Sequence, residues 1–537
     1  MPHTECPLFS WSVLKTVTQA TCITQHVLFD DAGLCTDTRA LKSGDFFIPL
    51  SGENFDGHQY LGQAFKAGAV GAFVSEAFYE GNTETFKENH QQWPNVLVVQ
   101  SPLSAYLAMA QYHRSQSSAL VIAITGSAGK TTTKEMLFAA FSPLKKTQKT
   151  AKNFNNEVGV AQTLLALKSD TEILIVEMGM RGLGEISVLS HAAKPDIAVI
   201  TNVGTAHIGR LGSRDNIMQA KLEITDGLHP ETGLLVMNTD SEGLLDAALQ
   251  KWTGDILPYS TQGAKPLQAS PGLFSYQIPQ FKEKPISVKV PGMHILSNTV
   301  AVMTIGQSIG LDVDALREGL KNYSQSEAGR WEKIPLPGYP HTTIINDAYN
   351  ASPESMQAAI EAFLSLETDM LPQAKAEKNP VALKKVLILG GMKELGDFSQ
   401  EKHAALGHWL AEQPHPFSLL TVGEEAAEIA AGYAIYQAKK QDQAKKQVKK
   451  NAGKLPPSNS TLSDSAPSDS GHSYLTCSEN KPVNTATALH FNTLDDLAKH
   501  CVAERSNQLD HCIILLKGSR ANQLDRLPEL LSQPVNC

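Results

Sequence analysis

A glycine-rich turn between an apolar run and a lysine-threonine pair is the clearest sign of chemistry in this chain. Residues 121–136 read VIAITGSAGKTTTKEM, so a β-branched strand leads into the turn and a helix start follows it. Backbone N–H groups of such a turn, together with the positive end of the helix dipole, bind phosphate. The pattern predicts that Lys130 reaches the β- and γ-phosphates of a nucleotide and that the Thr131 hydroxyl binds Mg²⁺. The residues expected at the nucleotide are Gly126, Ser127, Ala128, Gly129, Lys130, Thr131 and Thr132.

This turn is a shorter variant of the usual phosphate-binding loop. The pattern G-x-x-x-x-G-K-[ST] would need glycine where Ile124 stands. A chance Gly-Lys-Thr in an ordinary turn is disfavoured, because the strand, the turn and the helix start are all present. The sequence therefore predicts nucleotide binding, and at this point a kinase, a switch, a motor and a ligase all stay open.

Three more polar residues follow the cradle at points where a parallel sheet would bind its ligand. Glu177 ends the apolar run ILIVE, and ligands of parallel sheets bind at the carboxyl ends of strands, where a carboxylate can meet Mg²⁺. His207 lies a few residues beyond the strand DIAVITNVG, and Lys221 lies on an expected helix. Taken alone, such a histidine is as often structural or exposed, and such a lysine is usually a solvated charge.

Polar residues also gather in the later part of the chain. Asn298, on an expected helix start four residues after His294, has the donor and acceptor that suit an adenine edge, although a core or capping role is as natural. The third α/β unit opens near Arg330, and Asp347, Tyr349 and Asn350 follow one of its expected strands. Later loops after strands hold Glu394, Lys517, Ser519 and Arg520, which could gather at one rim, although none of these residues is decisive singly.

The elements that must position these residues read as three α/β units in series, with boundaries at 1–105, 106–327 and 328–537. Strand-like runs such as ALVIAIT, EILIVEMG, DIAVITNVG and GLLVMNTD are apolar throughout rather than alternating. Strands of that kind are buried on both faces, as in a parallel sheet covered by helices. The segment 437–484 is lysine-rich and then Ser/Pro/Asp-rich, so we expect a disordered insertion there in preference to a basic docking tail.

Composition narrows the class of protein. The net charge of −9 argues against a nucleic-acid-coating surface. We find no apolar run of membrane-spanning length and no secretory signal, and the seven cysteines form no C-x-x-C pair. We therefore expect a cytoplasmic protein with reduced thiols and neither a nucleic-acid partner nor a membrane span.

Taken in order, the motifs resemble those of the Mur ligases, the ATP-dependent amide-forming enzymes that build the peptidoglycan stem peptide. The shared strings are GSAGKTTTKE, NFNNEVGVAQTLL, EMGMRGLGEI, TNVGTAHIGRLGS and AKLEI, and the resemblance covers nearly the whole chain. It implies an α/β fold of three domains, with a central phosphate-loop ATPase sheet and a Rossmann-like last domain. Within the family, DAYNASPESM, GGMKELG, KGSR and the early TDTRALKSGDFFIPLSGENFDGH point to the member that adds a dipeptide.

The resemblance implies a reaction and a set of partners. ATP would activate the carboxylate of UDP-N-acetylmuramoyl-tripeptide as an acyl phosphate, and D-alanyl-D-alanine would attack it. The expected cofactors are ATP and two Mg²⁺ ions, and we expect a monomer. A related amide ligase, such as a folylpolyglutamate-type enzyme, and a nucleotide-binding protein without catalysis are the alternatives.

Residue roles follow from the same resemblance. Lys130 and Thr131 would hold the phosphates and the first Mg²⁺, with Glu177 completing its shell, His207 helping with a second ion, and Lys221 carbamylated. The adenosine contacts would come from Asn298, Asp347, Tyr349 and Asn350, with Arg330 near the phosphates or the domain junction. The substrate contacts would come from Thr38 and Arg39 at the uridine end, Asn155 and Asn156 at the sugar-peptide, and Glu394, Lys517, Ser519 and Arg520 in the third domain.

Two positions depart from the family pattern. Ile295 stands where the usual H-N-x-x-N has its first asparagine, so that contact is in doubt. Asn346 replaces the first of two aspartates, which leaves Asp347 as a single carboxylate before the Tyr-Asn pair.

Overall fold

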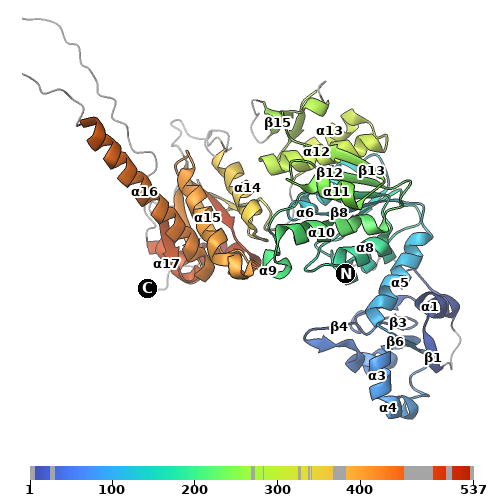
Figure 1. Ribbon diagram of the computed structural model, residues 1–537. Coiled ribbons are helices and arrows are strands. Elements are labelled where there is room, and N and C mark those ends of the chain that lie inside the picture. Colours follow the sequence, from blue (N-terminus) through green and yellow to red (C-terminus); the bar gives the residue numbers. More distant parts are fainter. Residues whose placement is uncertain are drawn as a thin grey trace, which may run out of the picture. The chain divides into compact units, whose positions relative to one another are not determined.

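The computed structural model describes residues 7–532, except 25–28, 30, 268–272, 282–283, 325–327, 337–338, 340, 367–382, 453–487 and 504–510. The chain forms two compact units, residues 1–324 and 325–537 (Figure 1). Each unit carries at least one sheet with its own covering helices.

A six-stranded parallel sheet lies at the centre of the first unit, in the order β13-β12-β11-β8-β10-β9. The four apolar runs expected to be buried strands are strands of this sheet, and β10 and β11 are buried along their whole length. The prediction of a parallel sheet is confirmed. The bounds are β8 Leu120–Thr125, β9 Thr147–Lys149, β10 Ile173–Glu177, β11 Ile197–Ile200, β12 Leu234–Asn238 and β13 Asp255–Tyr259.

Two groups of helices pack around this sheet. Helix α6 (Lys130–Phe141) contacts α12 (Met293–Ser308) and α13 (Val313–Asn322). Helix α5 (Pro102–Ser115) contacts α7 (Glu157–Leu165) and α8 (Glu185–Ala193). The shorter helices are α9 Ile208–Leu211, α10 Arg214–Leu222 and α11 Leu244–Lys251, and a small antiparallel sheet consists of β14 Lys265–Pro266, β15 Phe274–Gln277 and β16 Ile286–Val288.

The first hundred residues build a separate five-stranded sheet, in the order β1-β7-β6-β3-β2. Only β1 runs antiparallel to its neighbour, and a buried cluster around Phe47, Leu61 and Phe86 fills the core beside the sheet. The strands are β1 Thr21–Thr24, β2 Leu34–Cys35, β3 Phe46–Phe47, β6 Gly71–Ser75 and β7 Val96–Val99, with the hairpin β4 Ser51–Gly52 and β5 Phe55–Asp56. The helices are α1 Trp11–Thr18, α2 Leu61–Lys66, α3 Glu76–Gly81 and α4 Thr83–Glu88.

Helix α5 begins with Ser101 as its N-cap and Pro102 in its first turn. Near its end Arg114 is buried and binds the carbonyl oxygen of Ala193 at 3.1 Å and the Asp196 carboxylate at 3.2 Å. The helix is thereby fixed to the region between α8 and β11.

The second unit contains a six-stranded sheet in the order β17-β18-β22-β19-β20-β21. Strand β17 is antiparallel to β18 and the other pairs are parallel, which gives the Rossmann-like arrangement. The strands are β17 Glu332–Pro335, β18 Thr343–Asn346, β19 Lys384–Gly390, β20 Ser418–Val422, β21 Ala488–Phe491 and β22 Cys512–Lys517. The helices are α14 Pro353–Leu364, α15 Ser399–Glu412, α16 Ala427–Ala452, α17 Leu494–Ala503 and α18 Leu527–Ser532.

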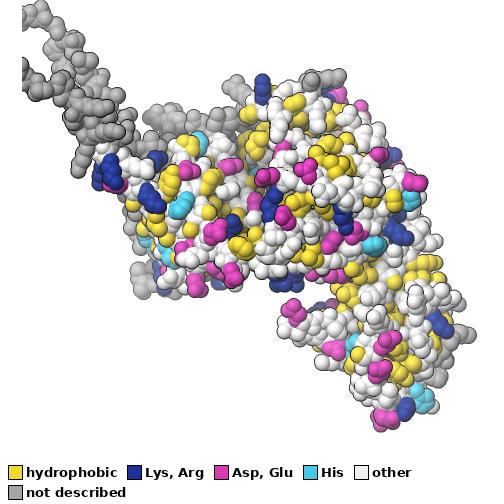
Figure 2. All heavy atoms as spheres, viewed as in Figure 1, with side chains coloured by type: hydrophobic (Ala, Val, Ile, Leu, Met, Phe, Trp, Pro, Cys, Tyr) yellow, Lys and Arg dark blue, Asp and Glu magenta, His cyan; other side chains and the backbone are white. Residues whose placement is uncertain are grey.

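Helix α16 corrects one expectation. The segment 437–484 was expected to be disordered from its start, yet α16 continues to Ala452, and residues 453–484 lie outside the described part. Alanine, lysine and glutamine are strong helix formers, so a low apolar content does not by itself end a helix. Exposed lysines gather on the described end of α16, including Lys439, Lys440 and Lys446 (Figure 2).

Candidate active site

The predicted phosphate cradle is a turn between β8 and α6, and its two glycines are required by geometry. Gly126 has φ 154° and Gly129 has φ 80°, both in the region that favours glycine. A Cβ atom on Gly126 would lie 1.9 Å from the Thr201 hydroxyl oxygen, and one on Gly129 would lie 2.9 Å from the Asn298 amide oxygen. The turn is therefore pressed closely between neighbouring elements.

The end of β11 fastens this turn, which the sequence reasoning missed. The Asn202 amide oxygen accepts from Ala128 N at 2.9 Å, and its Nδ2 donates to the Ala128 carbonyl oxygen at 3.1 Å. The Thr201 hydroxyl donates to the same carbonyl at 2.6 Å. The string TNVG after a buried strand was the available signal, because β8 and β11 are neighbours in register.

Lys130 and Thr131 begin α6, where the free N–H groups and the helix dipole attract anions. The Lys130 ammonium donates to the Gly126 carbonyl oxygen at 2.7 Å, so its side chain folds back over the turn. This is the position from which a lysine can meet a phosphate in the cradle.

Glu177 ends β10 next to β8, and its carboxylate is 1% exposed. Its Oε1 accepts from the Thr131 hydroxyl at 3.1 Å and from Asn155 Nδ2 at 2.7 Å. Among the described residues Oε2 accepts no hydrogen bond and faces the Lys134 ammonium at 3.3 Å. A buried carboxylate oxygen with an unused acceptor, beside a threonine hydroxyl, suits a hard cation such as Mg²⁺.

Lys221 lies in α10 and is 1% exposed, so the reading of a helical lysine as a solvated charge does not hold here. Its burial, together with the nearby positive charge of Lys130, holds the pKa of its amine well below the usual 10.5. His207 has φ 68°, in the left-handed region, and precedes α9. Within the described ranges no three His, Cys, Asp or Glu side chains converge as a metal site, so a metal role for His207 stays a prediction.

Asn298 lies on α12 beside the cradle, 4% exposed and in contact range of Gly129. Its Nδ2 is buried and has no hydrogen-bond acceptor among the described residues. Ile295, one turn earlier, is a core residue at 1% exposure, which explains why an apolar side chain is tolerated where an asparagine was expected. The adenine contact predicted for Asn298 is not tested by this geometry.

Asn155 and Asn156, expected at the sugar-peptide, already have partners within the protein. Asn155 donates to Glu177, and Asn156 is the N-cap of α7, where its oxygen accepts from Gly159 N at 3.0 Å. Within the first hundred residues, Thr38 lies in a turn beside the exposed Arg39. The Arg39 guanidinium pairs with the Asp37 carboxylate at 2.7 Å. Hydrogen bonds from Arg39 lower the pKa of Asp37 to about 2.

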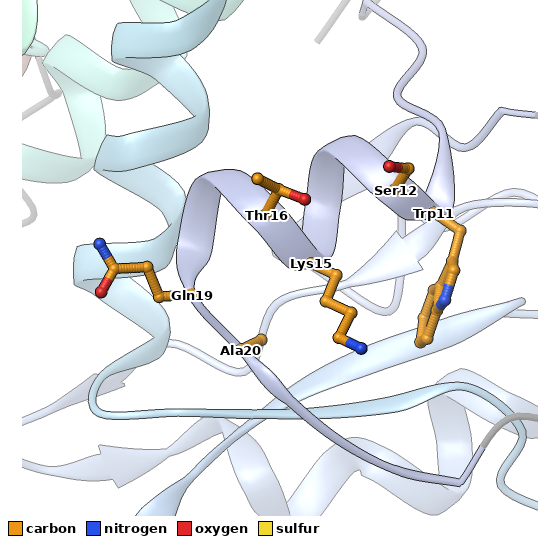
Figure 3. A pocket seen from close by; sticks show the side chains of 6 residues that line it. All are labelled: Trp11, Ser12, Lys15, Thr16, Gln19 and Ala20. Atoms are coloured by element: carbon orange, nitrogen blue, oxygen red, sulfur yellow. The ribbon is translucent and has the colours of Figure 1, made fainter.

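A pocket lies beside α1 and is lined by Trp11, Ser12, Lys15, Thr16, Gln19 and Ala20 (Figure 3). None of these residues is among those expected to bind substrate. We assign the pocket no function.

In the second unit, the carboxyl ends of β18 and β22 bring Asp347, Asn350 and Lys517 together. The buried Lys517 ammonium pairs with Asp347 Oδ2 at 2.9 Å and donates to the carbonyl oxygens of Asp347 at 3.0 Å and Asn350 at 2.8 Å. Lys517 therefore already has partners within the protein, and the dipeptide contact predicted for it is not tested by this geometry.

Around the same strand ends, Arg330 lies over the Tyr349 ring with its guanidinium carbon 4.4 Å from the ring centre, and Arg520 lies at 5.7 Å. Ser519 donates to the Asn522 amide oxygen at 3.0 Å, and Glu394 has φ 63° in the loop after β19. Arg330, Tyr349 and Arg520 thus lie near one another in this unit, while the rim expected for Glu394, Lys517, Ser519 and Arg520 stays a prediction. The substrate and nucleotide contacts predicted for this group stay predictions.

A parallel sheet that ends in this cradle, next to a buried glutamate and a buried lysine, fits an ATP-dependent ligase of the Mur type, and the comparisons with known proteins show that class. The family model described as "Mur ligase middle domain" matches residues 124–306. The chain is 37% identical over 404 residues to the UDP-N-acetylmuramoyl-tripeptide–D-alanyl-D-alanine ligase of Bacillus subtilis, covering 74% of this chain and 82% of the relative. It is 36% identical over 379 residues to the ligase of that name from Synechocystis, covering 70% and 75%.

A comparison with solved structures points to the same family as these relatives. A crystal structure of MurF from Acinetobacter baumannii matches with a TM-score of 0.76 and 26% identity, over 98% of this chain and 100% of that one. The chain belongs to the MurF family, the UDP-N-acetylmuramoyl-tripeptide–D-alanyl-D-alanine ligases, and has the three-domain architecture of Mur ligases. No described helix is both long enough and apolar enough to cross a membrane.

Proposed function

We propose that this chain joins D-alanyl-D-alanine to UDP-N-acetylmuramoyl-tripeptide at the expense of ATP, giving the pentapeptide precursor of peptidoglycan. The observation that carries the proposal is identity of 36–37% to ligases of that name over at least three quarters of their length. The phosphate cradle beside Glu177 and Lys221 supports the same reaction.

The proposed chemistry runs through an acyl phosphate. The tripeptide carboxylate attacks the γ-phosphorus of ATP and ADP leaves; the dipeptide amine then attacks the acyl carbon, and phosphate leaves as the amide forms and a proton is released. Lys130 and the N–H groups at the start of α6 would bind the transferring phosphoryl group and stabilise its charge. Water must be kept away from the acyl phosphate, because hydrolysis would waste it.

The metal proposal assigns Thr131 and Glu177 to one Mg²⁺ and His207 and Lys221 to a second. Bound Mg²⁺ would neutralise phosphate oxygens during the transfer. A neutral buried amine reacts with carbon dioxide, so the lowered pKa of Lys221 supports its conversion to a carbamate, which could bind a cation.

The other contacts to the substrates and the nucleotide belong to the same proposal. Thr38 and Arg39 would bind the uridine end, Asn155 and Asn156 the sugar-peptide, and Glu394, Lys517, Ser519 and Arg520 the dipeptide, while Asn298, Arg330, Asp347, Tyr349 and Asn350 would serve the nucleotide. Residues 1–105, 106–327 and 328–537 are the proposed domains. We also propose a cytoplasmic monomer.

Phosphate release from ATP tests the proposed function. The wild-type chain should release phosphate only when the UDP-tripeptide and D-alanyl-D-alanine are both present. Lys130→Ala should lower this rate by about 10²–10³-fold, the usual loss for a group that stabilises transition-state charge. Lys168→Ala, at an exposed lysine of the same domain, is the matched control and should keep the wild-type rate. Equal release without either acceptor, or a clear preference for a single amino acid over the dipeptide, would contradict the proposal.

A further inference from the structure

Lys134 is a fully buried lysine in α6, one turn after Lys130, the first residue of that helix. Its ammonium lies 3.3 Å from Glu177 Oε2 and 3.4 Å from Glu135 Oε1, and it donates to the Lys152 carbonyl oxygen at 2.5 Å. Burying an ammonium is costly unless it is paired and hydrogen-bonded. Methionine or leucine would fill the same space without that cost. The three polar contacts therefore indicate that the Lys134 ammonium itself has a role.

The hydrogen bond to Lys152 holds a strained point of the backbone. Lys152 has φ 48°, in the left-handed region that non-glycine residues seldom adopt. This residue leads directly into Asn155, whose side chain donates to Glu177 Oε1 at 2.7 Å and whose carbonyl oxygen accepts from Gly179 N at 2.8 Å. Lys134 therefore holds the start of the segment 152–155, while Asn155 at its end holds the carboxylate.

The two oxygens of Glu177 are thereby given different surroundings. Asn155 and Thr131 donate to Oε1, whereas Oε2 accepts no hydrogen bond from the described residues and lies 3.3 Å from the Lys134 ammonium. We infer that Lys134 is a positioning residue for the metal site: it anchors residues 152–155 and, through Asn155, orients the Glu177 carboxylate toward the cation. This inference rests on the proposed function, which assigns Mg²⁺ to Glu177.

A competing role for the Lys134 ammonium predicts the opposite change in Mg²⁺ affinity. If Lys134 acted on Glu177 mainly as a rival positive charge, its removal would strengthen Mg²⁺ binding. The shorter contact is to Lys152, at 2.5 Å against 3.3 Å to the carboxylate, so anchoring outweighs competition. Loss of the ammonium should then weaken Mg²⁺ binding.

Calorimetric titration of ADP into the full-length chain, with and without Mg²⁺, tests this without catalysis. In the wild type Mg²⁺ should tighten ADP binding. In Lys134→Met that tightening should fall about 10-fold or more, the usual cost of removing a group that orients a metal ligand. Asn155→Ala should show a similar fall, and the double variant should lie within about twofold of Lys134→Met, because both residues act through one carboxylate.

Matched controls separate positioning from general stability. Lys385→Met removes a half-buried lysine whose ammonium also donates to backbone carbonyls, those of Leu364 at 2.5 Å and Leu366 at 2.8 Å, at the other end of β19 from the loop that follows this strand. It should lower Tm and leave the Mg²⁺ effect unchanged. If Lys134→Met does not fold, Lys134→Arg keeps the charge and several donors and should retain at least about a third of the wild-type Mg²⁺ effect.

The outcomes are distinct. A Lys134→Met protein with lower Tm but the full Mg²⁺ effect, or with a larger one, overturns the inference, as does a folded Lys134→Arg protein that retains none. A wild-type chain whose ADP binding ignores Mg²⁺ overturns the proposed metal site itself.

Discussion

At the scale of single residues, burial decides what a lysine in this site can do. Lys221 and Lys134 are both on helices and both nearly inaccessible, yet their surroundings differ. Lys134 faces two carboxylates and a carbonyl oxygen, which stabilise its charge. Lys221 instead meets the positive field of Lys130, which, with burial, lowers the pKa of its amine and favours the neutral nucleophile.

This difference predicts a selective modification. In ¹³C-bicarbonate the wild-type chain should show a carbamate carbon by NMR, and Lys221→Ala should not. The variant should also lose turnover by about 10²-fold or more, with partial return on adding a small carboxylate, because the carbamate supplies an anion to the site. Lys251→Ala, which removes a lysine paired with Asp226 near the chain's surface, should keep both signals. A carbamate signal that survives in Lys221→Ala would place the modification elsewhere.

Sequence reasoning at this scale identified residue types better than their surroundings. Gly126, Gly129, Lys130 and Glu177 could be predicted because the strand–turn–helix pattern is local. Lys134 could not, since a lysine on a helix is normally solvated and only tertiary packing shows that it faces Glu177. Asn156 could have been recognised, because an asparagine directly before EVGVAQTLL is a helix N-cap.

At the scale of elements, the cradle depends on β11 as much as on its own glycines. Asn202 makes two side-chain hydrogen bonds to Ala128 and its carbonyl oxygen accepts from Ser127 N at 3.1 Å. Asn202→Ala would free both partners and let the turn relax. We expect the KM for ATP to rise about 10-fold and the free energy of unfolding to fall by about 1–3 kcal/mol, since the half-buried backbone groups of Ala128 lose their partners.

A matched change separates those two effects. Asn95 is fully buried, whereas Asn202 is half-buried, and the Asn95 amide donates to the Val70 carbonyl oxygen at 2.7 Å beside the five-stranded sheet of the first hundred residues. Asn95→Ala should lower stability comparably and leave the KM for ATP unchanged. Steady-state kinetics and urea unfolding measure both quantities, and an unchanged KM in Asn202→Ala would show that the glycines alone set the turn.

In the second unit, His403 supports the loop after β19. Its Nε2 accepts from Met392 N at 2.8 Å and its Nδ1 lies 2.7 Å from the Ser399 carbonyl oxygen, an arrangement that needs the neutral ring with the proton on Nδ1. Burial lowers the pKa of His403 below its usual 6.5, opposed by the nearby carboxylates of Glu425 and Glu428 and aided by Lys393.

The sign of the pH effect follows. As the pH falls below 6.5, the unfolded chain takes up a proton at His403 more readily than the folded chain does. The free energy of unfolding therefore falls as the pH falls through and below 6.5. His403→Gln should flatten this acid loss in urea unfolding between pH 5 and 7. His191→Gln, at an exposed histidine of α8, should leave the wild-type slope, and an identical slope in His403→Gln would assign the dependence to other groups.

Prediction of elements was strongest where apolar runs were unbroken. Strands β8, β10, β11 and β12 coincide with the four apolar runs named from the sequence. The edge strands β9 and β13 were not predicted, because TQK and DILPY lack the continuous apolar pattern of a strand buried on both faces. The small sheet β14-β15-β16 was missed for the same reason.

At the scale of the whole molecule, contacts divide the chain between residues 324 and 325, close to the domain boundary proposed at 327/328. Each unit has its own buried core, and in the second unit that core lies around Ile344, Leu497 and Leu524. The two units carry different groups at the carboxyl ends of their strands. The first presents a phosphate cradle and a buried carboxylate, and the second presents a buried ion pair with two arginines near one tyrosine ring.

The long connection between α16 and β21 is the part of the molecule that the proposed function does not use. Residues 453–487 lie outside the described part, and their sequence is rich in Ser, Pro and Asp and poor in apolar residues. Replacing 455–485 with a short Gly-Ser linker should therefore leave phosphate release within about twofold of wild type. A shorter connection also loses less entropy when its ends are brought together, so unfolding should cost about 1–2 kcal/mol more.

Urea unfolding and the phosphate assay measure this deletion directly. The matched control replaces the same residues with a shuffled sequence of equal length and composition, which should match the wild type in both readouts. Loss of activity in the deletion but not in the shuffled chain would mean that the connection's length matters. Loss in both would mean that its particular sequence contributes to ligation, and the segment would then belong to the working parts of the molecule.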